Sequence, residues 1–378
     1  MISTWKDCLL GDLLTLQRGF DLPARKREEG SVPIISSSGI TGFHDEAKVE
    51  APGVVTGRYG TLGEVFYIEQ DFFPLNTTLY VRDFKGSNPR FISYLLQTLN
   101  LKPQNVAAAV PGLNRNDLHL LSVRKPPIAT QRKIADILSG YDRLIENNTR
   151  RIKILEEMAQ LLYREWFINF RFPGYEQVSM VESELGLIPQ GWKVRKVKDV
   201  VLRLRVGKTY KEEELNKTGL VPVIDQSRKS FLGFHSNQPD HTASPEKPII
   251  IFGDHTCKAE LVVEAFSLSP NVIPFIAKED LPIAYLYFLV NSLVETQEYK
   301  RHWTDLNNKS VVVGSVRLAR EFSLFSRDIF AQIYALQRKN LNLKHTRDLL
   351  LPKLISGEID VETIATSDLK ALEERLVA

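Results

Sequence analysis

The sequence has few cysteines, little net charge and no long apolar run. Its two cysteines among 378 residues, Cys8 and Cys257, lie far apart and form neither a CxxC pair nor a zinc-binding spacing, which fits a reducing cytosol. No 18 consecutive residues are apolar, so no membrane-spanning helix is expected. Residues 1–7 lack the apolar core of a signal peptide. We therefore expect a cytoplasmic protein.

The net charge of +3 gives no indication of nucleic-acid binding by bulk basicity. The length suits two or three domains, and a content of 43% hydrophobic and 25% charged residues is normal for a folded soluble protein. Any case for DNA binding must therefore come from organisation and motifs.

The sequence also lacks a recognisable catalytic constellation. It has no G-x-x-x-x-G-K-[ST] loop and no HExxH, and the glycines of residues 57–63 have turn spacing rather than dinucleotide-loop spacing. His255 and Cys257 lie close but lack further metal ligands. Asn88-Pro89-Arg90-Phe91 is similar to the Asn-Pro-Pro-aromatic loop of amino-methyltransferases, but Arg90 occupies the third position and no glycine-rich cofactor loop precedes it; a proline-initiated helix is favoured. We expect no catalytic, cofactor-binding or metal-binding residue in this chain.

The chain repeats itself once, with a period of about half its length. A Trp-Lys pair opens each half, at Trp5 and at Trp192, and a glycine follows each, at Gly19 and Gly207. Further phrases correspond in the same order: 32–36 with 221–225, 52–57 with 247–253, 73–76 with 268–271 and, more loosely, 112–116 with 306–309. Six correspondences in one order indicate a duplicated architecture.

Each half ends in a long helical pattern whose seam positions alternate by four and three residues. The first seam is Ile134, Leu138, Tyr141, Ile145, Asn148, Ile152, Leu155, Ala159, Leu162 and Trp166. The second is Ile329, Ile333, Leu336, Asn340, Leu343, Arg347, Leu350 and Leu354. A single seam of this kind usually packs on its own domain, but two matched seams favour an intramolecular antiparallel coiled coil, roughly 48 Å long at ~1.5 Å per residue.

The rest of each half consists of short β-branched and aromatic runs broken by Gly, Pro, Asn and Ser, which indicates strands, turns and a few helices. We therefore predict an α+β fold: two mixed α/β heads separated by two long helices that form an antiparallel coiled coil, with pseudo-two-fold internal repetition. The expected boundaries are 1–127 for the first head, 128–172 for the first helix, 173–190 for a linker, 191–318 for the second head, 319–361 for the second helix and 362–378 for a tail.

Three phrases resemble the specificity subunit of type I restriction-modification systems, the HsdS family. Residues 126–134 are similar to the family's Pro-Pro-x-x-x-Gln entry to its first conserved helix, residues 183–192 to its junction into the second head, and residues 347–360 to its closing phrase. The resemblance extends from Trp5 to about Val361. One departure is that the second helix lacks the Pro-Pro-x-x-x-Gln entry and has residues 316–321, Val-Arg-Leu-Ala-Arg-Glu, instead.

The resemblance implies a non-catalytic DNA reader. Each head, a target recognition domain, would read one half of a bipartite asymmetric site in double-stranded DNA, and the helices would set the spacing and dock two modification subunits. Those subunits would bind S-adenosylmethionine and methylate adenine, and a restriction subunit, where present, would use ATP and Mg²⁺. This chain itself would hold no cofactor and would work in a prokaryotic cytoplasm.

Candidate DNA-binding residues are polar and basic side chains in loops, because these residue types bind base edges. For any single one of them, a turn-forming or solvent-facing role is the more common one for such residues in loops. The first head offers Ser36, Ser37, Ser38, Arg58, Tyr59, Asn76, Asn114 and Arg115. The second offers Gln226, Ser227, Arg228, His255, Asn307, Asn308 and Lys309.

Two other classes of function remain open on the residues alone. The first is a methyltransferase fused to its own recognition domain, against which the missing cofactor loop argues. The second is a structural adaptor whose heads bind protein rather than DNA, against which only the family phrases argue. Binding of S-adenosylmethionine by the isolated chain would identify the first, and co-purification with a methyltransferase-like subunit would separate the second from a specificity subunit.

Overall fold

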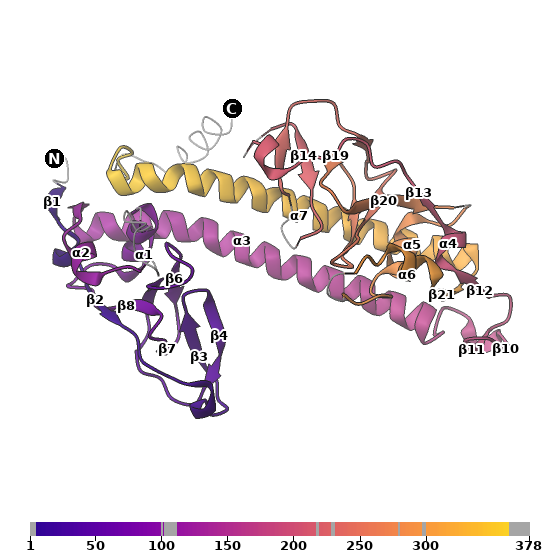
Figure 1. Ribbon diagram of the computed structural model, residues 1–378, viewed down its shortest axis with the longest axis horizontal. Coiled ribbons are helices and arrows are strands. Elements are labelled where there is room, and N and C mark those ends of the chain that lie inside the picture. Colours follow the sequence, from indigo (N-terminus) through magenta and orange to yellow (C-terminus); the bar gives the residue numbers. More distant parts are fainter. Residues whose placement is uncertain are drawn as a thin grey trace. The chain divides into compact units, whose positions relative to one another are not determined.

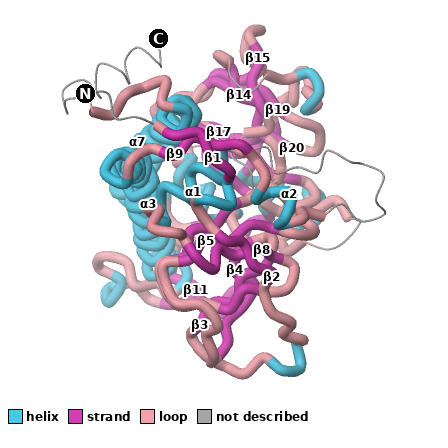
Figure 2. The backbone as a smooth tube through the Cα atoms, turned by 90° about the vertical axis from the view of Figure 1, so that its left-hand side faces the viewer, coloured by secondary structure: helices cyan, strands magenta, loops and turns pink. Residues whose placement is uncertain are grey.

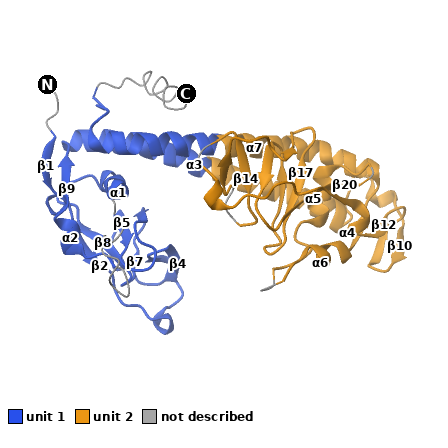
Figure 3. Ribbon diagram, turned by 45° about the horizontal axis from the view of Figure 1, so that its top comes forward, with its two compact units in different colours: residues 1–147, 339–378 blue, residues 148–338 orange. Residues whose placement is uncertain are grey.

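A computed structural model describes residues 5–99, 101, 112–216, 219–227, 231–278, 280–296 and 300–362. The chain divides into two compact units: unit 1 comprises residues 1–147 and 339–378, and unit 2 comprises residues 148–338 (Figure 3). Both boundaries fall inside the two long helices, α3 (Ile128–Tyr163) and α7 (Val316–Ser356). Each unit therefore contains one globular head and one end of both helices. Within the part of the chain described above, no helix is long and apolar enough to cross a bilayer.

The head of unit 1 is built from two sheets, a two-stranded ribbon and two short helices (Figures 1 and 2). The antiparallel four-stranded sheet has the order β2 (Thr15–Arg18), β8 (Thr78–Asp83), β5 (Gly53–Gly57) and β6 (Val65–Ile68). The second sheet has the order β4 (Gly39–His44), β3 (Val32–Ser36) and β7 (Phe73–Pro74). The ribbon pairs β1 (Lys6–Leu9) with β9 (Ser122–Lys125), and the helices are α1 (Pro89–Thr98), which packs on β5 and β6, and α2 (Arg115–His119).

The head of unit 2 repeats this topology, with one additional strand in its second sheet. Its antiparallel four-stranded sheet has the order β13 (Val201–Arg203), β20 (Val272–Ala277), β17 (Ile249–Gly253) and β18 (Ala259–Val262). Its second sheet has the order β15 (Gly233–His235), β14 (Val221–Ile224), β19 (Ala265–Leu268) and β16 (His241–Thr242). The ribbon pairs β12 (Lys193–Lys196) with β21 (Ser310–Val313), and the helices are α4 (Val197–Val200), α5 (Ile283–Val290) and α6 (Trp303–Asn308).

The α+β fold with internal repetition is therefore confirmed. The central strands β5 and β17 are buried along their whole length, which agrees with their nearly continuous apolar sequences, Gly-Val-Val-Thr-Gly and Ile-Ile-Ile-Phe-Gly. In both heads the second sheet contains one parallel pair, β3 with β7 and β14 with β19. The duplicated sequence phrases thus specify duplicated sheets.

In unit 1 the beginning of α3 and the end of α7 run antiparallel and share one apolar core with the head. Ile134 and Leu138 of α3 and Leu350 and Leu354 of α7 are each at most 1% exposed and belong to this core. Asp142 accepts a hydrogen bond of 2.7 Å from the Arg347 guanidinium across the pair. Burial of these apolar side chains supplies most of the attraction, because each contributes about 1.5–3 kcal/mol when removed from water.

In unit 2 the end of α3 and the beginning of α7 pack through aromatic side chains. The ring centroids of Tyr163 and Phe322 lie 5.8 Å apart, and those of Trp166 and Phe322 lie 6.3 Å apart. Tyr163 also stacks on Phe288 of α5 at 5.5 Å, which ties the head to the helices. Every seam position predicted from the sequence is buried or half-buried in its own unit.

Gln131 explains why a glutamine follows the proline pair at the start of α3. Its side chain is 1% exposed, donates to the Pro126 carbonyl at 2.9 Å and accepts from the Asn88 amide at 2.9 Å. One side chain thus joins the first turn of α3 to the start of α1. At the equivalent place in α7 stands Ala319, which is fully buried but has no polar group, so α7 begins without this contact.

The element boundaries differ from the expected ones at three places. A π-helical turn, Arg164–Ile168, ends the first long helix four residues before position 172. The second begins at Val316 rather than 319 and ends at Ser356 rather than 361, because Gly357 adopts a left-handed φ of 76° and closes the helix. The expected linker contains a hairpin of β10 (Met180–Ser183) and β11 (Gly186–Pro189).

Candidate nucleic-acid interface

A loop held by backbone hydrogen bonds follows the central strand β5 in the first head. The backbone amides of Arg58 and Tyr59 both donate to the Thr77 carbonyl, at 2.8 and 3.2 Å. The Arg58 carbonyl in turn accepts from the Leu113 amide at 3.0 Å. Backbone bonds therefore connect the end of β5 to the segment before β8 and to the segment before α2, and they fix the positions from which the side chains of Arg58 and Tyr59 extend.

These segments enclose a pocket of about 550 Å³ that contains three arginines. Arg18 reaches it from the end of β2, because β2 pairs with β8 in the register that places Arg18 opposite Leu79. The residues that line the pocket are Arg18, Arg58, Tyr59, Leu79, Gly112, Leu113, Asn114 and Arg115.

The charge of this pocket is largely uncompensated. Arg18 lies 3.5 Å from Asp21, whereas Arg58 and Arg115 form no ion pair with any carboxylate of the described residues. The Arg58 guanidinium lies over the Tyr59 ring, 4.4 Å from its centroid, so one face of the guanidinium is covered and its N–H edge stays available. Several guanidiniums near one concave site repel one another, and an anionic ligand relieves that repulsion.

Gly112 is required by the packing of Tyr59. A Cβ at position 112 would lie 2.4 Å from a carbon of the Tyr59 ring, closer than any real contact. Larger residues would therefore displace Tyr59, and with it the support of the Arg58 guanidinium. The glycine of the phrase at 112–116 thus has a packing reason that the sequence alone does not show.

Four of the eight candidates in the first head, Arg58, Tyr59, Asn114 and Arg115, line this pocket. The side chain of Asn114 is already used, because its oxygen accepts from the Asn116 amide at 3.0 Å and caps α2. Arg18 was not among the residues predicted from the sequence, where its only signal is a cation directly before the repeated Gly19. Only strand pairing brings Arg18 to Arg58.

The remaining candidates of the first head form turns and internal contacts. The Ser36 hydroxyl lies 3.0 Å from that of Ser38 and accepts from the Ser38 amide at 3.2 Å. Ser37 lies against Gly60 of the loop after β5. Asn76 donates through its side-chain amide to Asp21, the partner of Arg18. None of these residues lines the pocket.

In the second head the structure brings Gln226 and His255 together but not the others. The Gln226 side chain accepts from the His255 amide at 3.0 Å, and His255 Nδ1 lies 3.0 Å from the Lys300 carbonyl. Ser227 donates its amide to Asp225 at 2.9 Å. Asn307 and Asn308 end α6 and Lys309 precedes β21, while Arg228 lies outside the described residues.

Topology corrects the looser correspondence between residues 112–116 and 306–309. The Leu113 amide donates to the Arg58 carbonyl, and at the equivalent place the His302 amide donates to the Asp254 carbonyl, at 2.9 Å. The counterpart of residues 113–115 is therefore near His302, at the beginning of α6 and not at its end. Asp254 also accepts from the His302 and Trp303 amides through its carboxylate. An arginine in the first head is thus replaced by a buried aspartate in the second.

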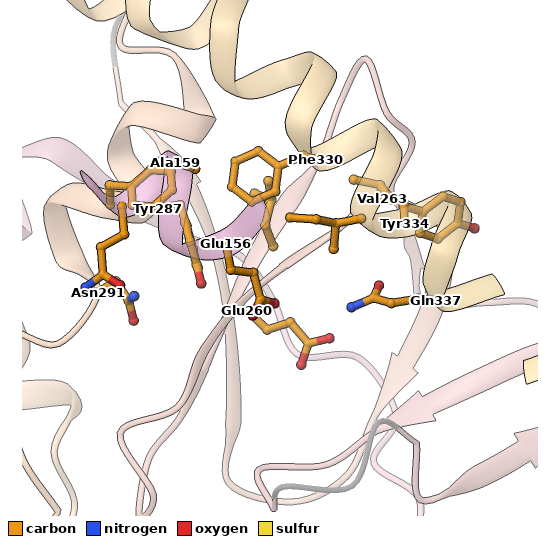
Figure 4. Close-up of a pocket in the computed structure, with 13 residues that line it drawn as sticks. Glu156, Ala159, Glu260, Val263, Tyr287, Asn291, Phe330, Tyr334 and Gln337 are labelled. Atoms are coloured by element: carbon orange, nitrogen blue, oxygen red, sulfur yellow. The ribbon is translucent and has the colours of Figure 1, made fainter. Parts of the chain in front are cut away.

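Unit 2 contains a different pocket, of about 260 Å³, between α3, α7 and the head. Two carboxylates, Glu156 of α3 and Glu260 of β18, lie close together there, near Tyr287 and Gln337 (Figure 4). Partial burial, followed by the charges of Glu260 and Glu157, raises the pKa of Glu156. Burial, followed by the negative charges of Glu156 and Glu260, raises the pKa of Tyr287 to about 12. Lys258 lies 2.7 Å from Glu260 and offsets part of this negative charge, but the pocket has no arginine in its lining and is less suited to phosphate than the pocket of the first head.

Replacing Glu156 with glutamine is expected to stabilise unit 2 at neutral pH. A raised pKa means that the folded state binds the proton more tightly than the unfolded state, so the ionised form opposes folding above that pKa. We expect Glu156→Gln to raise the melting temperature by roughly 1–3 °C at neutral pH, a small gain because the side chain is partly exposed. The gain should shrink as the pH falls through the pKa of Glu156.

The matched control is Glu157→Gln on the same helix turn, where Glu157 lies 3.8 Å from Lys153 and faces solvent. Because the charge of Glu157 adds only the smallest part of the shift at Glu156 and its loss also removes the ion pair with Lys153, this variant should raise the melting temperature less than Glu156→Gln does. A Glu156→Gln protein that melts no higher than the wild type at neutral pH would show that the paired carboxylates carry no repulsion.

Comparison with known proteins gives one consistent result. Residues 2–157 match the family described as "Type I restriction modification DNA specificity domain". The chain is 25% identical over 323 residues, 77% of this chain and 74% of the relative, to the type I restriction enzyme MjaIX specificity subunit of Methanocaldococcus jannaschii. It is 25% identical over 302 residues, 76% of each chain, to a putative type I specificity subunit of Mycoplasma pneumoniae. The crystal structure of a type I restriction-modification S subunit from M. genitalium shares the fold, with a TM-score of 0.62, 16% identity and coverage of 94% of this chain and 96% of that one.

Proposed function

Because this chain belongs to the family of type I restriction-modification specificity subunits, which are not the catalytic subunits, we propose that its two heads each read one half of a bipartite, asymmetric DNA site. The observation that carries this proposal is the pocket of the first head, where Arg58 and Arg115 have no carboxylate partner among the described residues. Heads of closely similar topology with different side chains around the equivalent loop would read different bases, which would make the site asymmetric.

The two long helices would set the spacing between the half-sites. The separation of two rigidly held readers selects the distance between half-sites, as it does in dimeric DNA-binding proteins. In support, both ends of the helix pair are anchored in apolar cores, by Leu138 and Leu354 in unit 1 and by Tyr163 and Phe322 in unit 2. Helices anchored in this way would hold the two heads at a fixed separation in the proposed complex.

Chemistry would then come from partner subunits in a prokaryotic cytoplasm. We propose that two modification subunits dock on the helix pair, bind S-adenosylmethionine and methylate the DNA. A restriction subunit, where the system has one, would supply ATP- and Mg²⁺-dependent cleavage. The small net charge of this chain is compatible with such a complex, because partners can contribute much of the phosphate binding.

The purified chain alone is expected neither to methylate DNA nor to hydrolyse ATP. Methylation should appear when modification subunits and S-adenosylmethionine are added, and it should be confined to sites with two defined halves. The measurement is transfer of labelled methyl groups to genomic DNA with each component omitted in turn. Methyl transfer by this chain alone would overturn the proposal, and a complex with partners that ignores DNA sequence would favour an adaptor.

A second apolar stripe on α3 supports the docking of partners on the helices. Ile154, Met158 and Leu161 follow one another at intervals of four and three residues, and 49%, 53% and 57% of their surfaces are exposed. This stripe lies apart from the buried seam of α3. An exposed helical stripe with this spacing fits the apolar face of another helix.

Placing charges on this stripe should prevent assembly without unfolding the chain. We expect the double variant Met158→Glu, Leu161→Glu to lose at least 10-fold in affinity for the modification subunits, because binding would bury the new carboxylates. Its melting temperature should stay near that of the wild type, since both side chains are exposed. Affinity is measured by co-purification and titration, with Lys153→Glu on the same helix as control. Unchanged assembly by the double variant would place the docking surface elsewhere.

A further inference from the structure

We propose that Arg58 reads a guanine in the half-site of the first head, while Arg115 binds a backbone phosphate beside it. This inference rests on the proposed function and specifies the chemistry of its first head. It assigns different tasks to two arginines that the sequence places among equivalent candidates.

Arg58 has the properties of a base-reading side chain. Its backbone amide and carbonyl are both bonded, to Thr77 and Leu113, so the side chain extends from a fixed point. Its guanidinium lies on the ring of Tyr59, which is itself packed against Gly112. A guanidinium with a covered face and no carboxylate partner presents its N–H edge in one orientation. That edge matches the O6 and N7 acceptors of guanine, and no other base offers two acceptors there.

Arg115 has the properties of a phosphate-binding side chain. It is the first residue of α2, it is exposed, and no hydrogen bond, ring contact or ion pair of the described residues restrains it. A long, unrestrained cation at the edge of a pocket contributes charge rather than geometry, and charge attracts the DNA backbone independently of sequence. Losing it should therefore weaken binding to all sequences alike.

Arg18 contributes to the shape of the pocket and not to base reading. It is paired with Asp21 at 3.5 Å, and Asp21 also accepts from Asn76. A guanidinium engaged in this way has fewer free donors than Arg58. Its pairing also lowers the net positive charge at the pocket, which makes Arg58 and Arg115 the two cations available to a ligand.

The second head cannot read guanine in the same way. Asp254 and His255 occupy the places of Arg58 and Tyr59. Asp254 is 6% exposed, and its carboxylate accepts hydrogen bonds from the backbone amides of His302 and Trp303 at the start of α6. This carboxylate serves the loop itself. The requirement for guanine that we assign to Arg58 therefore applies to the first half-site only.

The test uses the full chain in complex with its modification subunits and begins with the target found by methylome sequencing of the wild type. We expect a guanine in the first half-site whose replacement by 7-deazaguanine, which lacks N7, weakens binding about 10-fold or more. Arg58→Lys keeps the charge but not the fork, so it should lose about 10- to 100-fold on the target and relax the preference at that one position. Arg115→Gln should weaken target and non-target DNA equally and lower the salt dependence by about one phosphate contact.

Three results would overturn the inference while the proposed function stands: a first half-site without guanine, an Arg58→Lys complex with the wild-type preference, or a change of base preference in Arg115→Gln. By contrast, a wild-type complex that methylates no bipartite site would contradict the proposed function itself. Melting curves of each variant ensure that loss of binding is not loss of folding.

Discussion

Adding seven residues to each long helix, after Asn148 in α3 and after Leu336 in α7, is expected to lengthen the spacer of the target by about three base pairs. Seven residues extend a helix by roughly 10 Å at ~1.5 Å per residue, and a base pair occupies ~3.4 Å of duplex. Both insertion points lie in unit 2, at its boundary with unit 1, so neither head is altered. Because the insertion is one heptad, the four-three alternation of both seams continues in phase.

The expected result is the same two half-sites with a longer spacer, or loss of tight binding. The second outcome arises if the heads cannot follow the DNA through the extra third of a turn, at ~10.5 base pairs per turn. A four-residue insertion is the matched control, since it shifts the phase of the seam and should destabilise the pair. Full activity of the heptad variant on the original half-sites at the original spacing would show that the helices do not set the distance.

Exchanging residues 1–127 for those of a relative is expected to change one half of the target and leave the other half unchanged. The exchange ends where α3 begins, at Ile128, so the helix pair is kept. The donor head must preserve two contacts with the retained helices. The backbone amide at position 88 donates to the Gln131 side chain, and Trp5 packs against Gly357 at the end of α7. Without them the new head would sit incorrectly on α3, and a loss of activity would say nothing about reading.

Methylome sequencing of cells with the chimaera and its partners gives the result directly. Loss of preference in one half-site would amount to several kcal/mol of discrimination, since each mismatched base pair costs about 1–3 kcal/mol. Changes in both half-sites after exchange of one head would contradict independent reading.

The sequence predicts the fold well because its signals are local and repeated. The heptad spacing specifies both long helices. The start of α3 at Ile128 follows from the proline pair directly before it and from Gln131, whose side chain donates to the Pro126 carbonyl from the first turn of the helix. The start of α7 is less visible, because Gly314 and Ser315 stand where the first helix has prolines and Ala319 stands where it has Gln131.

The candidate site is less predictable because it is assembled by strand pairing. Arg18 and Arg58 are 40 residues apart and meet only through the register of β2, β8 and β5. Asn114 resembles a base reader in sequence but caps α2. The polar phrases at 112–116 and 306–309 match because helix ends and turns use the same residue types, not because they occupy equivalent places.

The most direct test of the central claim, that this chain selects the DNA sequence on which other subunits act, is methylome sequencing of cells that express the modification subunits with and without this chain. We predict methylation at one bipartite, asymmetric motif when the chain is present and none at that motif when it is absent. Identical methylation in both cells, or methylation in cells that contain this chain but no modification subunit, would contradict the account.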